Sequence, residues 1–209
     1  MTHSLHRQGT VASLRNDFVF LWDPAKGLND KDIAEKALEV IKAAVDAGCI
    51  NWADRNQDGG GVLNRDIESI KTNLNNKTHL RGVFSSKENI TNFLKTLKEK
   101  DLGISLVMSG LLDEVIDACK EANLVPHTIN FSTGVWGKKE LLAPEDILAI
   151  TTMCGHHIIS PEIVQELLKK VRSGTKTAEE AAMELGKLCP CGLFNHVRGA
   201  QLLQELATK

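Results

Sequence analysis

Short apolar runs alternate with longer amphipathic stretches along the first two thirds of the chain. The apolar runs predict strands at residues 18–22, 49–53, 80–84, 104–108 and 127–131. Between them, apolar residues recur three and four positions apart, which is the spacing of one helix face. These stretches predict helices at residues 30–47, 64–74, 87–100 and 111–122. Strands that alternate with helices are typical of βαβ units, whose crossovers place helices on both faces of a sheet. We therefore expect an α/β fold with a parallel sheet of about five strands and flanking helices.

The last third of the chain carries helix signals without strand signals. Residues that favour a helix N-terminus mark four starts, at Pro144, Ser160, Thr177 and Asn195. A serine, threonine or asparagine side chain can accept a hydrogen bond from the first helical turn, and proline fits the first helical position. The change in pattern predicts an α/β domain over residues 1–137 and a helical module over residues 138–209.

Three cysteines lie in two segments between the helices of this module. Cys154 belongs to Thr-Thr-Met-Cys-Gly-His-His, and Cys189 and Cys191 belong to Cys-Pro-Cys-Gly-Leu-Phe-Asn. Thiolate sulfur and imidazole nitrogen are the ligands that soft and borderline metals prefer. The helices between the segments can form a hairpin that brings both segments to one end. We therefore predict that the three cysteines bind one metal centre.

Two kinds of centre fit this ligand set. In a [4Fe–4S] cluster with three cysteines, the fourth iron would be held by His156, His157 or His196, or would be open to substrate. Cys49 and Cys119 are poorer candidates, because they fall in segments with a core pattern. A zinc ion would take three thiolates and one histidine, although common zinc motifs place two to four residues between paired cysteines and this chain places one. We rank the cluster first and zinc second.

Other residues near the cysteines are candidates for contact with the cofactor. Gly155 and Gly192 follow two of the cysteines and would let the backbone turn tightly around an ion or cluster. Asn195 would cap the next helix, whose positive end favours a thiolate or an anionic cluster. We therefore assign these three residues to cofactor binding.

The catalytic candidates are His156, His157 and Ser109. Imidazole can bind a metal when neutral and can move protons near neutral pH when free. Ser109 ends a predicted strand, and ligands bind beyond the carboxyl ends of the strands in parallel sheets. Asp23 would lie at that same edge, whereas His79, at the start of a strand, would lie at the opposite edge.

The cysteine motifs resemble a pattern in uncharacterised proteins of anaerobic prokaryotes. The pattern is Thr-Thr-Met-Cys-Gly-His, followed by Pro- or Leu-Cys-x-Cys-Gly-x-Phe-Asn, and the resemblance covers residues 126–206. It implies a metal or cluster role for Cys154, Cys189 and Cys191, and no particular reaction. His157 stands where the pattern has a less specialised residue, so the resemblance favours His156 as the ligand.

Composition limits the functions that remain. The 209 residues are 42% hydrophobic and 25% charged, with a net charge of −2, which gives no electrostatic case for binding nucleic acid or an anionic membrane. No apolar stretch approaches the length of a membrane span. The five cysteines are an odd number, which argues against a disulfide framework and favours a reducing compartment.

These observations lead to one expected function and one alternative. We expect a cytoplasmic iron–sulfur enzyme of anaerobic metabolism that acts on a small molecule by lyase-type or sulfur-handling chemistry, and we leave a homo-oligomer open. The alternative is a non-catalytic zinc-binding accessory or interaction protein. The polar segment at residues 3–9 could supply an acid/base group or an anion contact, but we favour a mobile terminus, as chain ends usually are.

Overall fold

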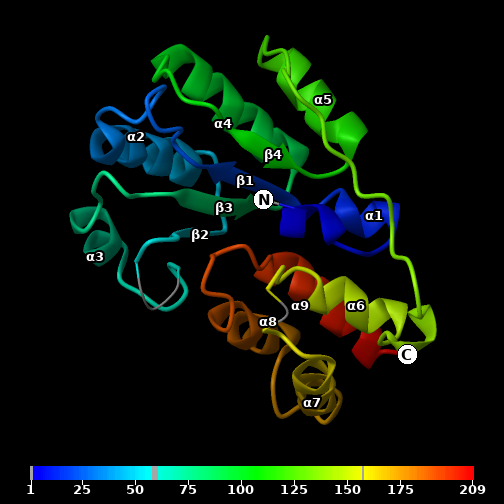
Figure 1. The fold of residues 1–209 in the computed structure, drawn as a ribbon. Coiled ribbons are helices and arrows are strands. Elements are labelled where there is room, and N and C mark those ends of the chain that lie inside the picture. The colour runs from blue at the N-terminus through cyan, green and yellow to red at the C-terminus, as the bar shows by residue number, and fades with distance from the viewer. Residues whose placement is uncertain (1, 58–60, 157) are drawn as a thin grey trace.

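A computed structural model describes residues 2–57, 61–156 and 158–209 (Figure 1). Its sheet has four strands in the order β2-β3-β1-β4. The strands are β1 (Phe18–Trp22), β2 (Asn51–Asp54), β3 (Leu80–Phe84) and β4 (Val107–Ser109). Every neighbouring pair is antiparallel. The prediction of a parallel sheet of about five strands is therefore wrong.

The error concerns strand direction and order more than strand position. β3 lies between β1 and β2 and runs antiparallel to both. β1 and β2 run in the same direction but are not hydrogen-bonded to each other. The fifth predicted strand, residues 127–131, does not form; this segment lies in the connection between the helices at residues 112–121 and 145–151. Ile129 and Phe131 in this segment are exposed.

The helices agree closely with the hydrophobic pattern. They are α1 (Val11–Leu14), α2 (Ile33–Asp46), α3 (Ile67–Thr72), α4 (Lys87–Lys100), α5 (Leu112–Glu121), α6 (Glu145–Thr151), α7 (Pro161–Arg172), α8 (Ala178–Lys187) and α9 (His196–Ala207), with 3-10 helices η1 (Thr2–His6) and η2 (Lys139–Leu141). Ser160, Thr177 and Asn195 each accept a backbone hydrogen bond as N-caps, and Thr177 forms a capping box with Glu180. These local signals place the helix starts correctly.

The sheet separates two hydrophobic cores (Figure 1). On one face, Phe20 and Phe84 pack against Phe93 of α4, with ring centroids 4.9 and 5.1 Å apart. On the other face, Val19 and Leu21 belong to the core that contains the cysteines and the buried side chains of α6 to α9. Helices thus cover both faces of the sheet, and a separate group of apolar side chains is buried on each face.

Arg81 interrupts the apolar lining of the second face. It pairs in register with Leu21 of β1 and Ala53 of β2, and it is 4% exposed. Side chains alternate along a strand, so Arg81 projects to the same side as Val83, toward the C-terminal helices. A buried positive charge therefore lies at the junction between the sheet and the helical module.

No helix in the part of the chain that the structure describes combines the length and the apolar character needed to cross a membrane.

Candidate metal centre

The structure brings Cys154, Cys189 and Cys191 together. Cys154 follows α6, and the other two lie between α8 and α9; all three are buried free thiols in the same core. The thiols of Cys154 and Cys189 are hydrogen-bonded, and the charge of Cys154 acts on Cys191. The two cysteine loops, which are residues 153–156 with 158–159 and residues 189–195, therefore meet at one site.

Hydrogen bonds to sulfur favour a thiolate at Cys154. The bond from Cys189 lowers the pKa of Cys154 to about 5, and backbone N–H groups of His156, Ile158 and Ile159 act in the same direction, against the effect of burial. The bond with Cys154, followed by burial, raises the pKa of Cys189. Of the two hydrogen-bonded thiols, Cys154 is therefore the more acidic and Cys189 the more basic.

Arginine side chains lie beside the third thiol. Burial raises the pKa of Cys191, while the positive charge of Arg81 opposes that rise and Arg55 adds to the opposition. The Arg81 side chain is 5% exposed, and its Nε has no hydrogen-bond partner within the described residues. The two arginines therefore offset part of the effect of burial on Cys191, although its pKa remains raised.

His156 is the histidine that contacts the cysteines. Its Nδ1 lies 3.6 Å and its Nε2 4.0 Å from the sulfur of Cys191, and its side chain is exposed at the edge of the buried site. His157 lies outside the described residues. His196 lines a groove between α8 and α9 beside Met183, and burial lowers its pKa. The geometry thus favours His156 over His196 as a partner of the thiols.

Gly192 and Asn195 hold the second cysteine loop in place. Gly192 has a φ of +62°, and a Cβ there would lie 2.5 Å from the backbone carbon of Trp52 in β2. Asn195 caps α9 by accepting a bond from Arg198 N at 2.9 Å, and its amide donates to Asn16 O at 2.7 Å. Gly155, half-buried, directly follows Cys154. Gly192 and Asn195 therefore shape the loop through packing and hydrogen bonds.

Ser109 lies beside the start of β1, at the other end of that strand from Asp23. It is 5% exposed at the end of β4, where its hydroxyl is 2.9 Å from that of Ser4. In an antiparallel sheet, successive strands end at opposite edges. The end of β4 therefore lies beside the start of β1, while Asp23 follows the other end of β1. The expectation of one ligand edge lined by all strand ends is wrong.

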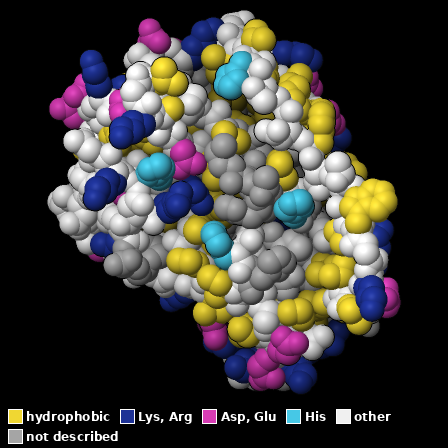
Figure 2. Space-filling model, in the orientation of Figure 1, with side chains coloured by type: hydrophobic (Ala, Val, Ile, Leu, Met, Phe, Trp, Pro, Cys, Tyr) yellow, Lys and Arg dark blue, Asp and Glu magenta, His cyan; other side chains and the backbone are white. Residues whose placement is uncertain are grey.

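The same antiparallel pairing places an acid–base pair near the cysteines. Asp23 follows β1 and His79 precedes β3, and the Asp23 carboxylate oxygen is 2.6 Å from His79 Nδ1. Arg81 Nη2 is 3.9 Å from that oxygen. The expectation that His79 lies at the opposite edge from Asp23 is therefore wrong. Figure 2 shows histidine side chains on the face seen there, one of them beside acidic and basic side chains.

As the side chains stand, no group of three or more His, Cys, Asp or Glu residues within 2–57, 61–156 and 158–209 is arranged to hold a metal ion. Arg81 is one of the residues at this site that the sequence interpretation missed. Its signal was a charged residue inside the apolar run at 80–84. Comparisons with protein-family models, with curated proteins and with solved structures found no match to this chain.

Proposed function

We propose that the protein is an iron–sulfur protein in which Cys154, Cys189 and Cys191 hold a [4Fe–4S] cluster. The observation that carries the proposal is the meeting of these thiols in a buried site supplied with backbone donors. Three N–H groups donate to Cys154, and those of Leu193 and Cys191 donate to Cys189. Clusters of this type are bound by cysteine thiolates and tuned by hydrogen bonds to sulfur.

The charges around the site support the same proposal. Three thiolates would bring negative charge into the protein interior. Burying a charge costs free energy unless a group of opposite charge or a hydrogen-bond donor lies beside it. Arg81 hydrogen-bonds Cys191, and both Arg81 and Arg55 favour its thiolate. Because Arg81 is buried, its charge is little screened by solvent. The two arginines would thus offset part of the cost of burying a negatively charged centre.

The fourth position of such a centre gives the protein a place for chemistry. An iron without a cysteine ligand supplies a Lewis acid that can bind a hydroxyl, carboxylate or sulfur. His156, exposed beside Cys191, would hold this position or move a proton next to it. The proposal therefore extends to lyase-type or sulfur-handling chemistry on a small molecule. A cytoplasmic, reducing location is part of it, because the cysteines must stay reduced.

One observation favours zinc as a second candidate. Three buried thiols and one histidine meet at the site, and three cysteines with one histidine are a ligand set of structural zinc sites. A zinc ion held by three cysteines and His156 would make the protein a zinc-stabilised accessory or interaction protein.

Metal analysis of anaerobically purified protein separates these functions. The cluster predicts about four iron and four sulfide ions per chain, with visible absorption that is bleached by reduction. Zinc predicts about one zinc ion per chain and no colour. A chain that binds neither after anaerobic reconstitution with iron and sulfide or with zinc contradicts both candidates. Cys119→Ser is the control for loss of a cysteine away from the site. It should keep the metal content of the wild type, since Cys119 belongs to the core on the other face of the sheet.

A further inference from the structure

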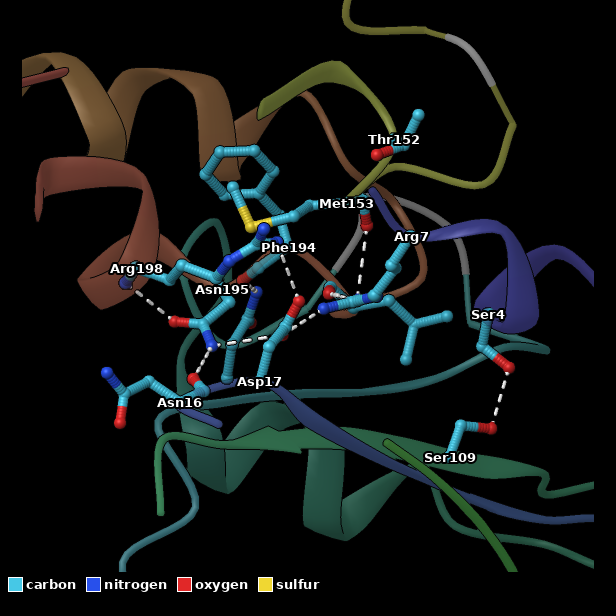
Figure 3. A network of polar contacts seen from close by, with 12 residues as sticks. Ser4, Arg7, Asn16, Asp17, Ser109, Thr152, Met153, Phe194, Asn195 and Arg198 are labelled. Atoms are coloured by element: carbon cyan, nitrogen blue, oxygen red, sulfur yellow. Dashed lines mark hydrogen bonds and ion pairs between the residues drawn. The ribbon is translucent and has the colours of Figure 1, made fainter. Parts of the chain in front are cut away.

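We propose that Arg7, Asp17 and Arg198 form a buried clamp that positions the two cysteine loops and sets how firmly they hold their metal centre. The clamp rests on contacts far apart in sequence, drawn in Figure 3. Its effect on the metal rests on the proposed function, whereas its effect on the loops does not. None of the three residues is a ligand; they are positioning residues.

Asp17 is the centre of the clamp. It directly precedes β1, and its side chain is fully buried. One carboxylate oxygen accepts hydrogen bonds from Arg7 Nη1 and from Asn195 Nδ2, the latter at 3.0 Å. The other oxygen accepts a bond from Arg198 Nη1 at 2.9 Å. A single carboxylate thus joins the N-terminal segment, the sheet and the start of α9.

Arg7 connects the clamp to both cysteine loops. Its Nη2 donates to the carbonyl of Met153 at 3.2 Å and to the carbonyl of Leu193. Met153 directly precedes Cys154, and Leu193 follows Cys191 by two residues. Because one nitrogen binds a carbonyl from each loop, Arg7 fixes the separation of the backbones that carry the thiols.

Arg198 anchors the other side of Asp17 and holds the N-terminal segment. Its side chain is fully buried. Nε donates to Ser13 Oγ at 2.8 Å, and Nη2 donates to Gln8 O at 2.6 Å. Arg7 and Gln8 of the polar segment at residues 3–9 are thus tied to the rest of the fold by hydrogen bonds.

The shape of the Arg7 side chain matters to the clamp as well as its charge. Two guanidinium groups surround one carboxylate, so the clamp carries one more positive than negative charge. The planar guanidinium of Arg7 also binds several acceptors in a fixed geometry, which the point charge of a lysine cannot reproduce.

The test compares Arg7→Gln and Arg7→Lys with Arg15→Gln, a control at an arginine whose side chain is 55% exposed. Two quantities are measured: the rate at which a chelator removes metal from the loaded protein, and amide hydrogen exchange in the metal-free protein. We expect Arg7→Gln to speed metal loss by about 10- to 100-fold, the usual effect of removing a residue that orients metal ligands. Exchange should rise in residues 153–159 and 189–195, and stay unchanged in β1 and β3.

We expect Arg7→Lys to restore the charge but not the slow metal loss, and Arg15→Gln to resemble the wild type. Full rescue by lysine, or loop exchange that equals the wild type in Arg7→Gln, overturns the clamp. If the wild type binds no metal, the proposed function fails separately. Loop exchange in the metal-free variants then decides alone whether Arg7 positions the loops.

Discussion

The sulfur of Cys191 lies 3.6 Å from Nδ1 of His156, although 35 residues separate them in sequence. This contact joins the two cysteine loops through side chains, as Arg7 joins them through carbonyl groups. His156 is exposed while Cys191 is buried. The histidine therefore lies between the buried thiols and the solvent from which a substrate would come.

Replacement of this histidine tests its role directly. We expect His156→Ala to change the visible spectrum of the loaded protein, or to weaken metal binding by about tenfold or more, with little change in fold. His127→Ala is the control, since His127 is exposed and hydrogen-bonded to the neighbouring Thr128. The assignment fails if His156→Ala is silent while His157→Ala or His196→Ala changes the spectrum.

Removing the charge of Asp17 should be severe. Asp17→Asn leaves two buried guanidinium groups without their carboxylate, and loss of one partner of a buried ion pair costs about 3–5 kcal/mol. Asp117→Asn, at an exposed carboxylate paired with Lys120, should change stability by about 0.5 kcal/mol or less. Denaturant unfolding of both variants measures this difference. Equal, small effects would show that the clamp does not stabilise the fold.

Two glycines with similar backbone angles separate crowding from backbone strain. Gly192 has φ +62° and would place a Cβ 2.5 Å from the backbone of Trp52, whereas Gly174 has φ +71° and open space around it. Both substitutions to alanine carry a strain of about 1–3 kcal/mol. We expect Gly192→Ala to destabilise the protein more than Gly174→Ala and to displace the second cysteine loop. Thermal unfolding and thiol alkylation rates measure the two effects.

The lowered pKa of Cys154 and the raised pKa of Cys189 predict a pH dependence for the reduced, metal-free protein. Between about pH 5 and the ordinary thiol pKa of about 8.5, the folded pair binds one proton and the unfolded chain binds two. The unfolded state then binds more protons, so the free energy of unfolding rises with pH across this window. Below about pH 5 this contribution is lost. Above about pH 8.5 it declines, because burial and the bond with Cys154 keep Cys189 protonated.

Urea unfolding across this range measures the slope, and Cys154→Ser is the control. The variant lacks the low-pKa thiol, so its stability should rise less between about pH 5 and pH 8. Equal slopes in the variant and the wild type would show that Cys154 is not a thiolate in the folded protein.

The helices could be predicted from sequence because their signals are local. Residues 87–100 were predicted as a helix, and α4 has those bounds, with Ser86 as its N-cap. The capping box at Thr177 is equally local. Such signals depend on neighbours within one turn, so tertiary structure rarely overrides them.

Strand direction could not be predicted, because it depends on packing between distant segments. Every residue of β1 is buried, since helices cover both faces of the sheet. The alternation of strands and helices along the chain favours a parallel sheet, but it does not determine strand direction. The insertion of β3 beside β1 leaves no local signal, yet it brings Asp23 and His79 together.

The cysteines were found from their motifs, but the groups that support them were not. In the sequence, Asp17 precedes a predicted strand and Arg198 lies within an amphipathic helix pattern. Polar residues at such positions are usually exposed to solvent. Their burial arises only when the N-terminal segment folds over α9. Arg81 carried a weak signal, as a charge within an apolar strand. Buried charged residues of this kind are recognised by their tertiary contacts, which cannot be predicted from a single sequence.

Metal content of single cysteine variants, purified anaerobically, tests the central claim most directly. We expect Cys154→Ser, Cys189→Ser and Cys191→Ser each to lose most of the metal bound by the wild type. Cys49→Ser and Cys119→Ser should keep it, because both cysteines pack with the core on the other face of the sheet. Wild-type metal content in any of the first three variants, or equal loss in all five, would contradict a single centre held by Cys154, Cys189 and Cys191.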